Sequence, residues 1–236
     1  MIVPAAGRGE RLGPGLPKAL RPINGVPMLV HAVRALSAAT SVSLVVIAAP
    51  EDGVDEVQRA LAEHGLLDGD GERAGLLVVA GGDTRQDSVA RAMLALPDDV
   101  DVVLVHDAAR PLVPSSLVDA VSAAVRSGAD AVVPGIPVAD TIKTVDEGGR
   151  VTGTPDRSML RAIQTPQGFR REVLAAAHAA ADPTAPATDD AGLVEALGGT
   201  VHVVAGDEEA FKITRPLDLV LAEAVLARRR ASGVLS

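Results

Sequence analysis

The chain has 236 residues, no cysteine, 1% aromatic residues and a formal net charge of −9. The missing cysteines exclude disulfide bonds, thiolate metal sites and thiol nucleophiles. The acidic charge and the scarcity of aromatic rings argue against a protein that binds nucleic acid. No apolar run is long enough to span a bilayer, and no signal-like segment precedes the first strand, so we expect a cytoplasmic protein without membrane contact. The length fits one domain, 1–236, with one sizeable core.

The first predicted element is a short strand at Ile2 and Val3, followed by small residues over 4–7 and by the cations Arg11 and Lys18. Small residues let backbone N–H groups approach phosphate oxygens, and nearby cations balance the charge. The glycine spacing fits neither the dinucleotide-binding fingerprint nor the P-loop. The segment therefore fits either a plain turn or a polyphosphate site of another kind.

Strands and helices then alternate. Buried strands are predicted at 43–49, 76–80, 100–105 and 131–134, and helices along 29–36, 54–61, 89–96 and 117–125, the last capped by Ser115 or Ser116. Such alternation predicts an α/β protein with a mostly parallel sheet covered by helices on both faces. Ligands are expected at the carboxyl ends of the strands.

The alternation stops at an inserted segment, approximately 137–158. Two extended stretches, 138–145 and 150–154, flank a polar turn at 146–149, which predicts a β-hairpin. Two-stranded hairpins are marginally stable alone in water. We therefore expect a protruding arm that packs against a second subunit.

After the arm, the chain returns to the α/β pattern. Helices are predicted at 173–180, from a cap at Thr188 through Leu197, and from Pro216 along Leu217, Leu221 and Ala224; strands are predicted at 201–205 and 210–214. The tail beyond Arg228 is expected to fray.

Three polar clusters follow predicted strands. Asp83 and Ser88 lie in a Gly-rich segment that fits either a base-reading loop or a turn with a helix cap. Asp107 comes directly after an apolar strand and suits Mg²⁺, which takes one or two carboxylates and completes its shell with phosphate oxygens and water. Its neighbour His106 fits a general base or, more often for a histidine at a strand end, an orienting or core residue. Lys212 lies in the short strand predicted at 210–214, where an inward-facing ammonium needs an anion.

Eight motifs along the chain carry a family resemblance. They are PAAGRGERLGPGLPK (4–18), AGGDTRQDSV (80–89), LVHDAARP (104–111), DTIK (140–143), DR (156–157), QTPQGF (164–169), TDDA (188–191) and KITRP (212–216). In this order they closely resemble the 2-C-methyl-D-erythritol 4-phosphate cytidylyltransferase family of the non-mevalonate isoprenoid pathway. The resemblance implies a Rossmann-like nucleotidyltransferase fold, a homodimer joined by the arm and Mg²⁺ dependence. It also implies a reaction of CTP with a sugar-alcohol phosphate.

The resemblance also implies roles for individual residues. Nucleotide-binding positions would be Ala5, Ala6, Gly7, Gly82, Asp83, Ser88 and Ala108. Catalytic cations would be Arg11, Lys18 and Lys212, with Asp107 as the metal ligand. Substrate-binding positions would be Arg110, Thr141, Arg157 and Thr165.

Two alternatives stay open from the sequence. One is a ribitol-5-phosphate cytidylyltransferase of the same superfamily, although the PAAG and HDAARP segments favour methylerythritol phosphate. The other is a nucleotide-binding regulatory domain without turnover, which has no evident need for both lysines and a metal carboxylate.

Overall fold

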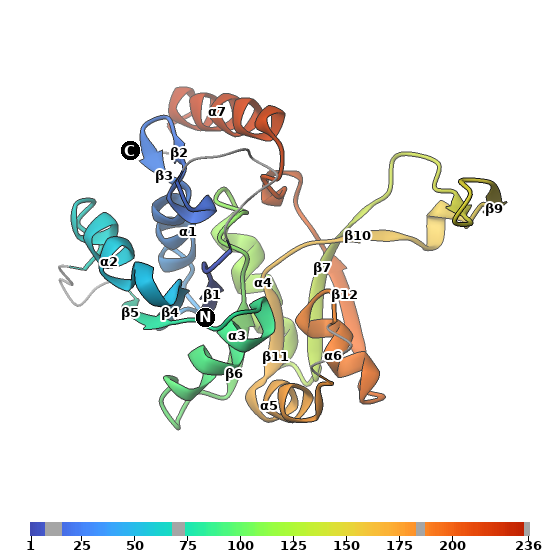
Figure 1. The fold of residues 1–236 in the computed structure, drawn as a ribbon, viewed down its shortest axis with the longest axis horizontal. Helices are drawn as coiled ribbons and strands as arrows, with labels where there is room; N and C mark the ends of the chain where they lie inside the picture. The colour runs from blue at the N-terminus through green and yellow to red at the C-terminus, as the bar shows by residue number, and fades with distance from the viewer. Residues whose placement is uncertain (8–15, 68–73, 183–186, 234–236) are drawn as a thin grey trace.

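One central sheet forms the body of the protein (Figure 1). In residues 1–7, 16–67, 74–182 and 187–233, which the computed structural model describes, this sheet has eight strands. Their order is β5–β4–β1–β6–β11–β7, with β10 and β12 both paired to β7. Their bounds are β1 (Ile2–Pro4), β4 (Leu44–Ala49), β5 (Gly75–Ala80), β6 (Val102–Val105), β7 (Ala131–Pro137), β10 (Arg161–Ile163), β11 (Gln167–Arg170) and β12 (Val201–Ala205).

The sheet is mostly parallel, as the sequence predicts, but one central strand is reversed. β5, β4, β1 and β6 are mutually parallel, while β11 runs antiparallel between β6 and β7. β11 enters from the arm by a short connection, and a strand that follows without a crossover helix pairs antiparallel. The amino end of β11 therefore lies beside the carboxyl end of β6.

Helices cover both faces of the sheet (Figure 1). Their bounds are α1 (Met28–Ser37), α2 (Val54–Ala62), α3 (Arg85–Leu94), α4 (Ser115–Arg126), α5 (Arg171–Ala180), α6 (Asp190–Ala196) and α7 (Pro216–Ala231). Val45 and Ile47 face a core cluster that includes α1, α2 and α4, whereas Val46 and Ala48 face a cluster that includes α3, α5 and α6. Successive side chains of a strand point to opposite faces, so a doubly covered strand is apolar throughout.

A small hairpin and the last helix form a third layer of packing. β2 (Pro22–Ile23) and β3 (Val26–Pro27) are joined by Asn24 and Gly25, both with positive φ, at 49° and 79°. An Asn-Gly pair is the preferred sequence for this kind of two-residue hairpin turn. α7 packs over the hairpin in a cluster with Ile23 and Ile213. Among the helices in the described ranges, none has the length and apolar character needed to cross a membrane.

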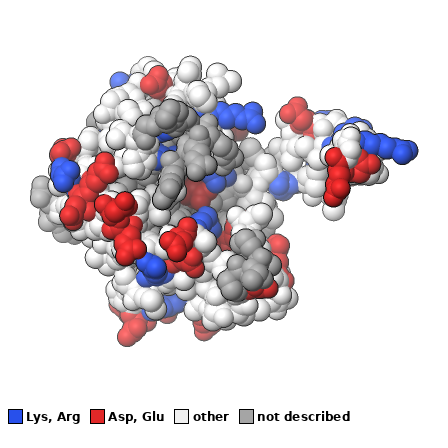
Figure 2. All heavy atoms as spheres, viewed as in Figure 1, with Lys and Arg blue, Asp and Glu red and all other residues white. Residues whose placement is uncertain are grey.

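The predicted hairpin projects from the body (Figure 1). β8 (Thr144–Val145) and β9 (Val151–Gly153) pair antiparallel around the turn at 146–149. The paired segments are shorter than the predicted stretches 138–145 and 150–154, because the chain on either side of them belongs to no strand. Figure 2 shows this arm standing off the body, with basic and acidic side chains on its surface.

Two predicted helix caps are wrong. α4 begins at Ser115 with Pro114 in the cap position and no side-chain cap, so neither Ser115 nor Ser116 caps it. α6 is capped by Asp189, whose carboxylate accepts from the Gly192 N–H at 2.9 Å, and not by Thr188. Serine, threonine and aspartate all favour this position, so neighbouring candidates cannot be separated by residue type.

Three predictions about the last part of the chain are also wrong. The segment 210–214 is not a strand, because Ala210 ends a 3₁₀ turn (Glu208–Ala210) and the hydrogen bond from the Ile213 N–H to the Ala109 carbonyl at 2.8 Å belongs to no ladder. α7 buries Ala222 and Leu226 but leaves Leu217 75% exposed, so its inner face is not the predicted one. The helix continues to Ala231, with Arg228 and Arg229 paired to Glu209.

Candidate active site

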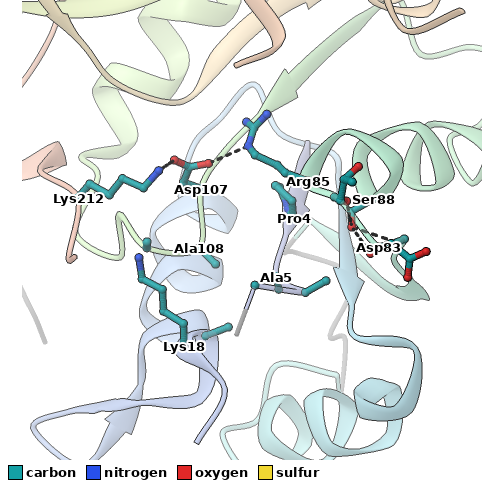
Figure 3. A pocket seen from close by; sticks show the side chains of 15 residues that line it. Pro4, Ala5, Lys18, Asp83, Arg85, Ser88, Asp107, Ala108 and Lys212 are labelled. Atoms are coloured by element: carbon teal, nitrogen blue, oxygen red, sulfur yellow. Dashed lines mark hydrogen bonds and ion pairs between the residues drawn. The ribbon is translucent and has the colours of Figure 1, made fainter. Parts of the chain in front are cut away.

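A cleft opens at the carboxyl ends of β1, β5 and β6 (Figure 3). Its cavity volume is about 200 Å³. Its lining residues are Pro4, Ala5, Ala6, Gly7, Lys18, Ala19, Gly82, Asp83, Thr84, Arg85, Ser88, Asp107, Ala108, Ala109 and Lys212. All of the nucleotide-binding, catalytic and metal positions predicted from the sequence are in this lining except Arg11, which lies outside the described residues.

The first wall of the cleft is the end of β1. The Ala5 N–H donates to the Ala48 carbonyl at 2.8 Å, which extends the β1–β4 pairing by one residue. A Cβ built on Gly7 would meet nothing within 4 Å, so the backbone here faces open space. Lys18, in a 3₁₀ turn (Lys18–Leu20), points towards Ala108 from another wall (Figure 3). The uncrowded backbone at Gly7 and the cation of Lys18 thus line the same cleft, which suits an anion.

The second wall is the loop after β5, and Ser88 organises it. The Gly82 N–H donates to Ser88 Oγ at 3.1 Å, and Ser88 Oγ donates to the Thr84 carbonyl at 2.9 Å. A Cβ on Gly82 would lie 2.3 Å from the Cβ of Asp87, so this close approach requires glycine. Thr84 and Asp87 form a capping box at the start of α3. The loop is therefore rigid, with the exposed Asp83 side chain at its edge.

The third wall carries the strongest charges. Asp107 Oδ2 lies 2.7 Å from Lys212 Nζ, and its Oδ1 lies 3.4 Å from Arg85 Nε (Figure 3). Burial alone would raise the pKa of Asp107, but the charges of Arg85 and Lys212 hold that pKa well below its usual range. Asp107 is therefore an anion at any physiological pH, within reach of two cations.

A buried histidine holds the backbone of Asp107. His106 Nε2 lies 3.0 Å from the Arg110 carbonyl, which can only accept, so Nε2 carries the proton. Nδ1 then accepts from the Thr165 hydroxyl at 3.0 Å, and the same hydroxyl oxygen accepts from the Asp107 N–H at 3.0 Å. Burial lowers the pKa of His106 to about 4. His106 is thus a neutral orienting residue with both nitrogens engaged, not a general base.

The predicted substrate-binding residues lie apart from this lining. Arg110 is 9% exposed and donates to the carbonyls of Ala210 and Ile163, at 2.6 and 3.2 Å. Thr141 and Arg157 are exposed on the arm, where Arg157 Nη1 donates to the Ala139 carbonyl at 2.8 Å. Within one chain, the structure does not bring the arm residues to the cleft.

Sequence reasoning missed Arg85. The segment GGDTRQDS drew attention to Asp83 and Ser88, yet Arg85 is the residue that reaches Asp107. The available signal was its place as the first residue of α3, directly after a loop at the carboxyl end of a strand. Its partner Asp107 is 22 residues away along the chain, and sequence spacing alone does not reveal such a pair.

The charged wall offers a metal ion one carboxylate, that of Asp107. Across the described ranges, no group of three or more His, Cys, Asp or Glu side chains is placed to hold a metal. Mg²⁺ commonly uses one or two carboxylates together with phosphate oxygens and water. Asp107 therefore fits a Mg²⁺ ion that arrives with a nucleotide, and does not fit a metal held by protein alone.

Comparison with known proteins gives a consistent match. The family model for 2-C-methyl-D-erythritol 4-phosphate cytidylyltransferase matches residues 1–228. A relative with this name from Streptomyces avermitilis is 59% identical over 235 residues, covering 97% of this chain and 92% of the relative. Another, from Frankia casuarinae, is 60% identical over 227 residues, covering 96% of this chain and 80% of the relative. The crystal structure of the enzyme of this name from Thermus thermophilus is 37% identical, with a TM-score of 0.74 and coverage of 96% of this chain and 98% of that chain.

Proposed function

The chain belongs to the 2-C-methyl-D-erythritol 4-phosphate cytidylyltransferase family, and we propose that it transfers a cytidylyl group from CTP to 2-C-methyl-D-erythritol 4-phosphate. The products are 4-diphosphocytidyl-2-C-methyl-D-erythritol and pyrophosphate, in the non-mevalonate route to isoprenoid precursors. The observation that carries this proposal is the cleft itself, where a glycine-dependent loop faces Lys18, Lys212, Arg85 and Asp107. This local cluster of cations, in a chain with a net charge of −9, suits a polyanionic substrate.

The reaction needs charge stabilisation more than proton transfer. A phosphate oxygen of the substrate forms a bond to the α-phosphorus of CTP, and the bond from that phosphorus to the pyrophosphate oxygen breaks. The attacking oxygen is already ionised, so no general base is required, in agreement with the neutral, buried His106. The obstacle is repulsion between two polyanions and the charge that builds on the leaving oxygens, which fixed cations stabilise.

The residues of the cleft divide this work. The small residues Ala5, Ala6 and Gly7 would leave room for the triphosphate along this side of the cleft, with Lys18 beside it. Lys212 would stabilise the negative charge that develops during transfer. The rigid Gly82 loop, with Asp83, would bind the edge of the cytosine base. Asp107 would hold Mg²⁺, which on binding supplies further positive charge at the phosphates.

The arm would complete the site in a homodimer. Thr141 and Arg157 are exposed residues of the arm, which projects from the body (Figure 1), and neither of them lines the cleft of their own chain. A guanidinium binds phosphate with two parallel hydrogen bonds, and two-fold symmetry would let each arm reach the other subunit's cleft. Arg110 and Thr165, which lie next to Asp107, would help to bind the sugar-alcohol phosphate. Thr165 accepts from the Asp107 N–H, and Arg110 donates to the Ile163 carbonyl.

CTP is an intracellular metabolite, so we place the reaction in the cytoplasm.

One assay tests this proposal. The purified protein is incubated with CTP, Mg²⁺ and either 2-C-methyl-D-erythritol 4-phosphate or ribitol 5-phosphate, and pyrophosphate release is followed. We expect turnover with methylerythritol phosphate and little with ribitol phosphate. Turnover only with ribitol phosphate would assign the other activity. CTP binding without turnover in either mixture would indicate a regulatory domain.

A further inference from the structure

Arg85 stands between two carboxylates that come from distant parts of the chain. Its Nη1 donates to Asp190 Oδ2 at 2.7 Å, whereas its Nε lies 3.4 Å from Asp107 Oδ1. Asp107 lines the cleft, but Asp190 is the first residue of α6 and is 1% exposed. The shorter contact of this guanidinium is therefore made to the carboxylate outside the cleft.

Asp190 is held on its other side by a histidine. His178, on α5, places Nε2 2.9 Å from Asp190 Oδ1, and its side chain is 4% exposed. A carboxylate only accepts, so Nε2 is the donor. Burial would raise the pKa of Asp190, but the hydrogen bond from His178 and the charge of Arg85 keep that pKa below its usual range. Asp190 is thus an ionised side chain with one donor on each oxygen.

The start of α6 is fixed without help from Asp190. The neighbouring Asp189 caps the helix at the Gly192 N–H and accepts from Gln167 Nε2 at 2.7 Å. Gln167 Oε1 in turn accepts from the Ala191 N–H at 3.2 Å. These contacts tie α6 to β11, so the charge of Asp190 has a role other than starting the helix. The contact of Asp190 with Arg85, whose side chain is 32% exposed, connects this charge to the cleft.

The division of Arg85 between two acceptors affects Asp107. Arginine and carboxylate groups tend to pair through two parallel hydrogen bonds. Asp107 receives only the long Nε contact from Arg85, and its other oxygen accepts from Lys212 at 2.7 Å. If Nη1 were released from Asp190, the guanidinium could turn and pair with both oxygens of Asp107. It would then compete with Lys212 and block the carboxylate.

We propose that Asp190, supported by His178, is a positioning residue that binds Nη1 of Arg85. This contact prevents the Arg85 guanidinium from forming two parallel hydrogen bonds with Asp107. Arg85 then contributes positive charge to the cleft, and the Asp107 carboxylate stays accessible to ligands in the cleft. Neither Asp190 nor His178 lines the cleft. The proposal rests on the proposed cytidylyl transfer, because the rate of that reaction is what the test measures.

A double-mutant cycle tests the proposal. We expect Asp190→Asn to lower kcat/KM for CTP by about ten- to a hundred-fold, the range seen when an outer partner of a site is removed. In an Arg85→Ala background the same change should alter kcat/KM by less than about two-fold, because the residue it restrains is gone. Arg85→Lys keeps the charge but has no fork, so it should also remove the sensitivity to Asp190→Asn. A purely structural role would lower activity equally in all three backgrounds, and that result would overturn the proposal.

Two controls keep the outcome interpretable. Asp189→Ala removes the neighbouring cap and the acceptor for Gln167, so it should lower the thermal midpoint, while its effect on kcat/KM should be the same with and without Arg85. If Asp190→Asn does not fold, His178→Leu takes its place and should give a smaller loss that also disappears with Arg85→Ala. An inactive wild-type protein would refute the proposed function, and the cycle would then be measured on CTP affinity by calorimetry. An unchanged rate and affinity in Asp190→Asn would refute the positioning role alone.

Discussion

The cleft and the arm carry functional side chains in opposite ways. In the cleft, charges from several elements hold one another, as Lys212 and Arg85 hold Asp107. On the arm, Arg157 contacts only a backbone carbonyl of the arm itself, among the contacts of the described residues, and Val145 is 58% exposed. The side chains of the cleft are therefore held in place within one chain. The arm, in contrast, exposes apolar surface and the side chain of Arg157. The difference supports the proposal that one chain binds the nucleotide and that the arm of a second subunit completes the site for the other substrate.

The largest effect is expected from the cleft. Lys18→Ala should lower kcat about a hundred- to a thousand-fold, or about 3 to 4 kcal/mol, because one charge-assisted contact to the separating triphosphate is lost. The KM for the sugar-alcohol phosphate should change much less. Steady-state kinetics with both substrates varied measure the two effects separately. A variant with near-normal kcat would remove Lys18 from the mechanism.

The second prediction concerns the arm and would sharpen the comparison most directly. Arg157→Ala should be nearly inactive as a homodimer, since the proposed phosphate contact across the two-fold axis is missing. Mixed dimers of Arg157→Ala with Lys18→Ala should regain up to about half the wild-type activity, because one of their two sites carries neither defect. The two variants are co-expressed with different tags, and the mixed dimer is isolated and assayed. A mixed dimer as inactive as its parents would mean that Arg157 does not act in the partner's cleft.

A third, smaller effect is expected at the carboxylate of the cleft. Asp107→Asn should lower activity about tenfold at saturating Mg²⁺ and shift the Mg²⁺ titration to higher concentration, because a neutral amide is a weaker ligand for a hard cation. The matched change on the arm, Asp156→Asn, removes an exposed carboxylate that accepts from the Ser158 N–H and does not line the cleft, so it should leave the Mg²⁺ titration unchanged. An unchanged titration for Asp107→Asn would contradict the metal role.

The smallest effect is on stability. The pKa of His106 falls from 6.5 to about 4 in the folded protein, so the unfolded chain binds a proton in this interval while the folded one does not. His106 therefore contributes stability above pH 6.5 that is lost as the pH falls towards 4, on the order of 3 kcal/mol. Chemical denaturation of His106→Gln should show a flatter pH profile in this window than the wild type. His202→Gln, which removes an exposed histidine, is the control and should keep the wild-type slope.

The sequence predicts the regular parts of the fold because their periodicity is strong. β4, with both faces buried, and α1, with one apolar stripe, follow directly from residue spacing. β10 and β11 were missed, because RAI and QGFR are short and do not alternate. The inner face of α7 was misjudged, because Leu217 and Leu221 have helical spacing but face outwards. Local pattern does not tell which apolar face a helix buries.

The same limit applies to the site. Small residues and cations near strand ends predicted most of the cleft lining, because parallel strands bring their carboxyl ends together. Arg85 and Asp190 were not predicted to meet, since 105 positions separate them. Their contact depends on how α3 and α6 pack on one face of the sheet, and no sequence spacing encodes it.

The pairing of β7 with β10 at the base of the arm has a consequence for how the arm can be altered. The arm leaves the sheet at Pro137 and returns at Arg161, which are paired neighbours in β7 and β10. An insertion whose two ends are already joined by a ladder can be shortened, lengthened or exchanged without moving the strands beneath it. Two residues after β10, Thr165 meets the Asp107 amide. The arm therefore has a fixed base, and an arm grafted from a relative between Pro137 and Arg161 should leave the strands beneath it and the contact between Thr165 and Asp107 in place.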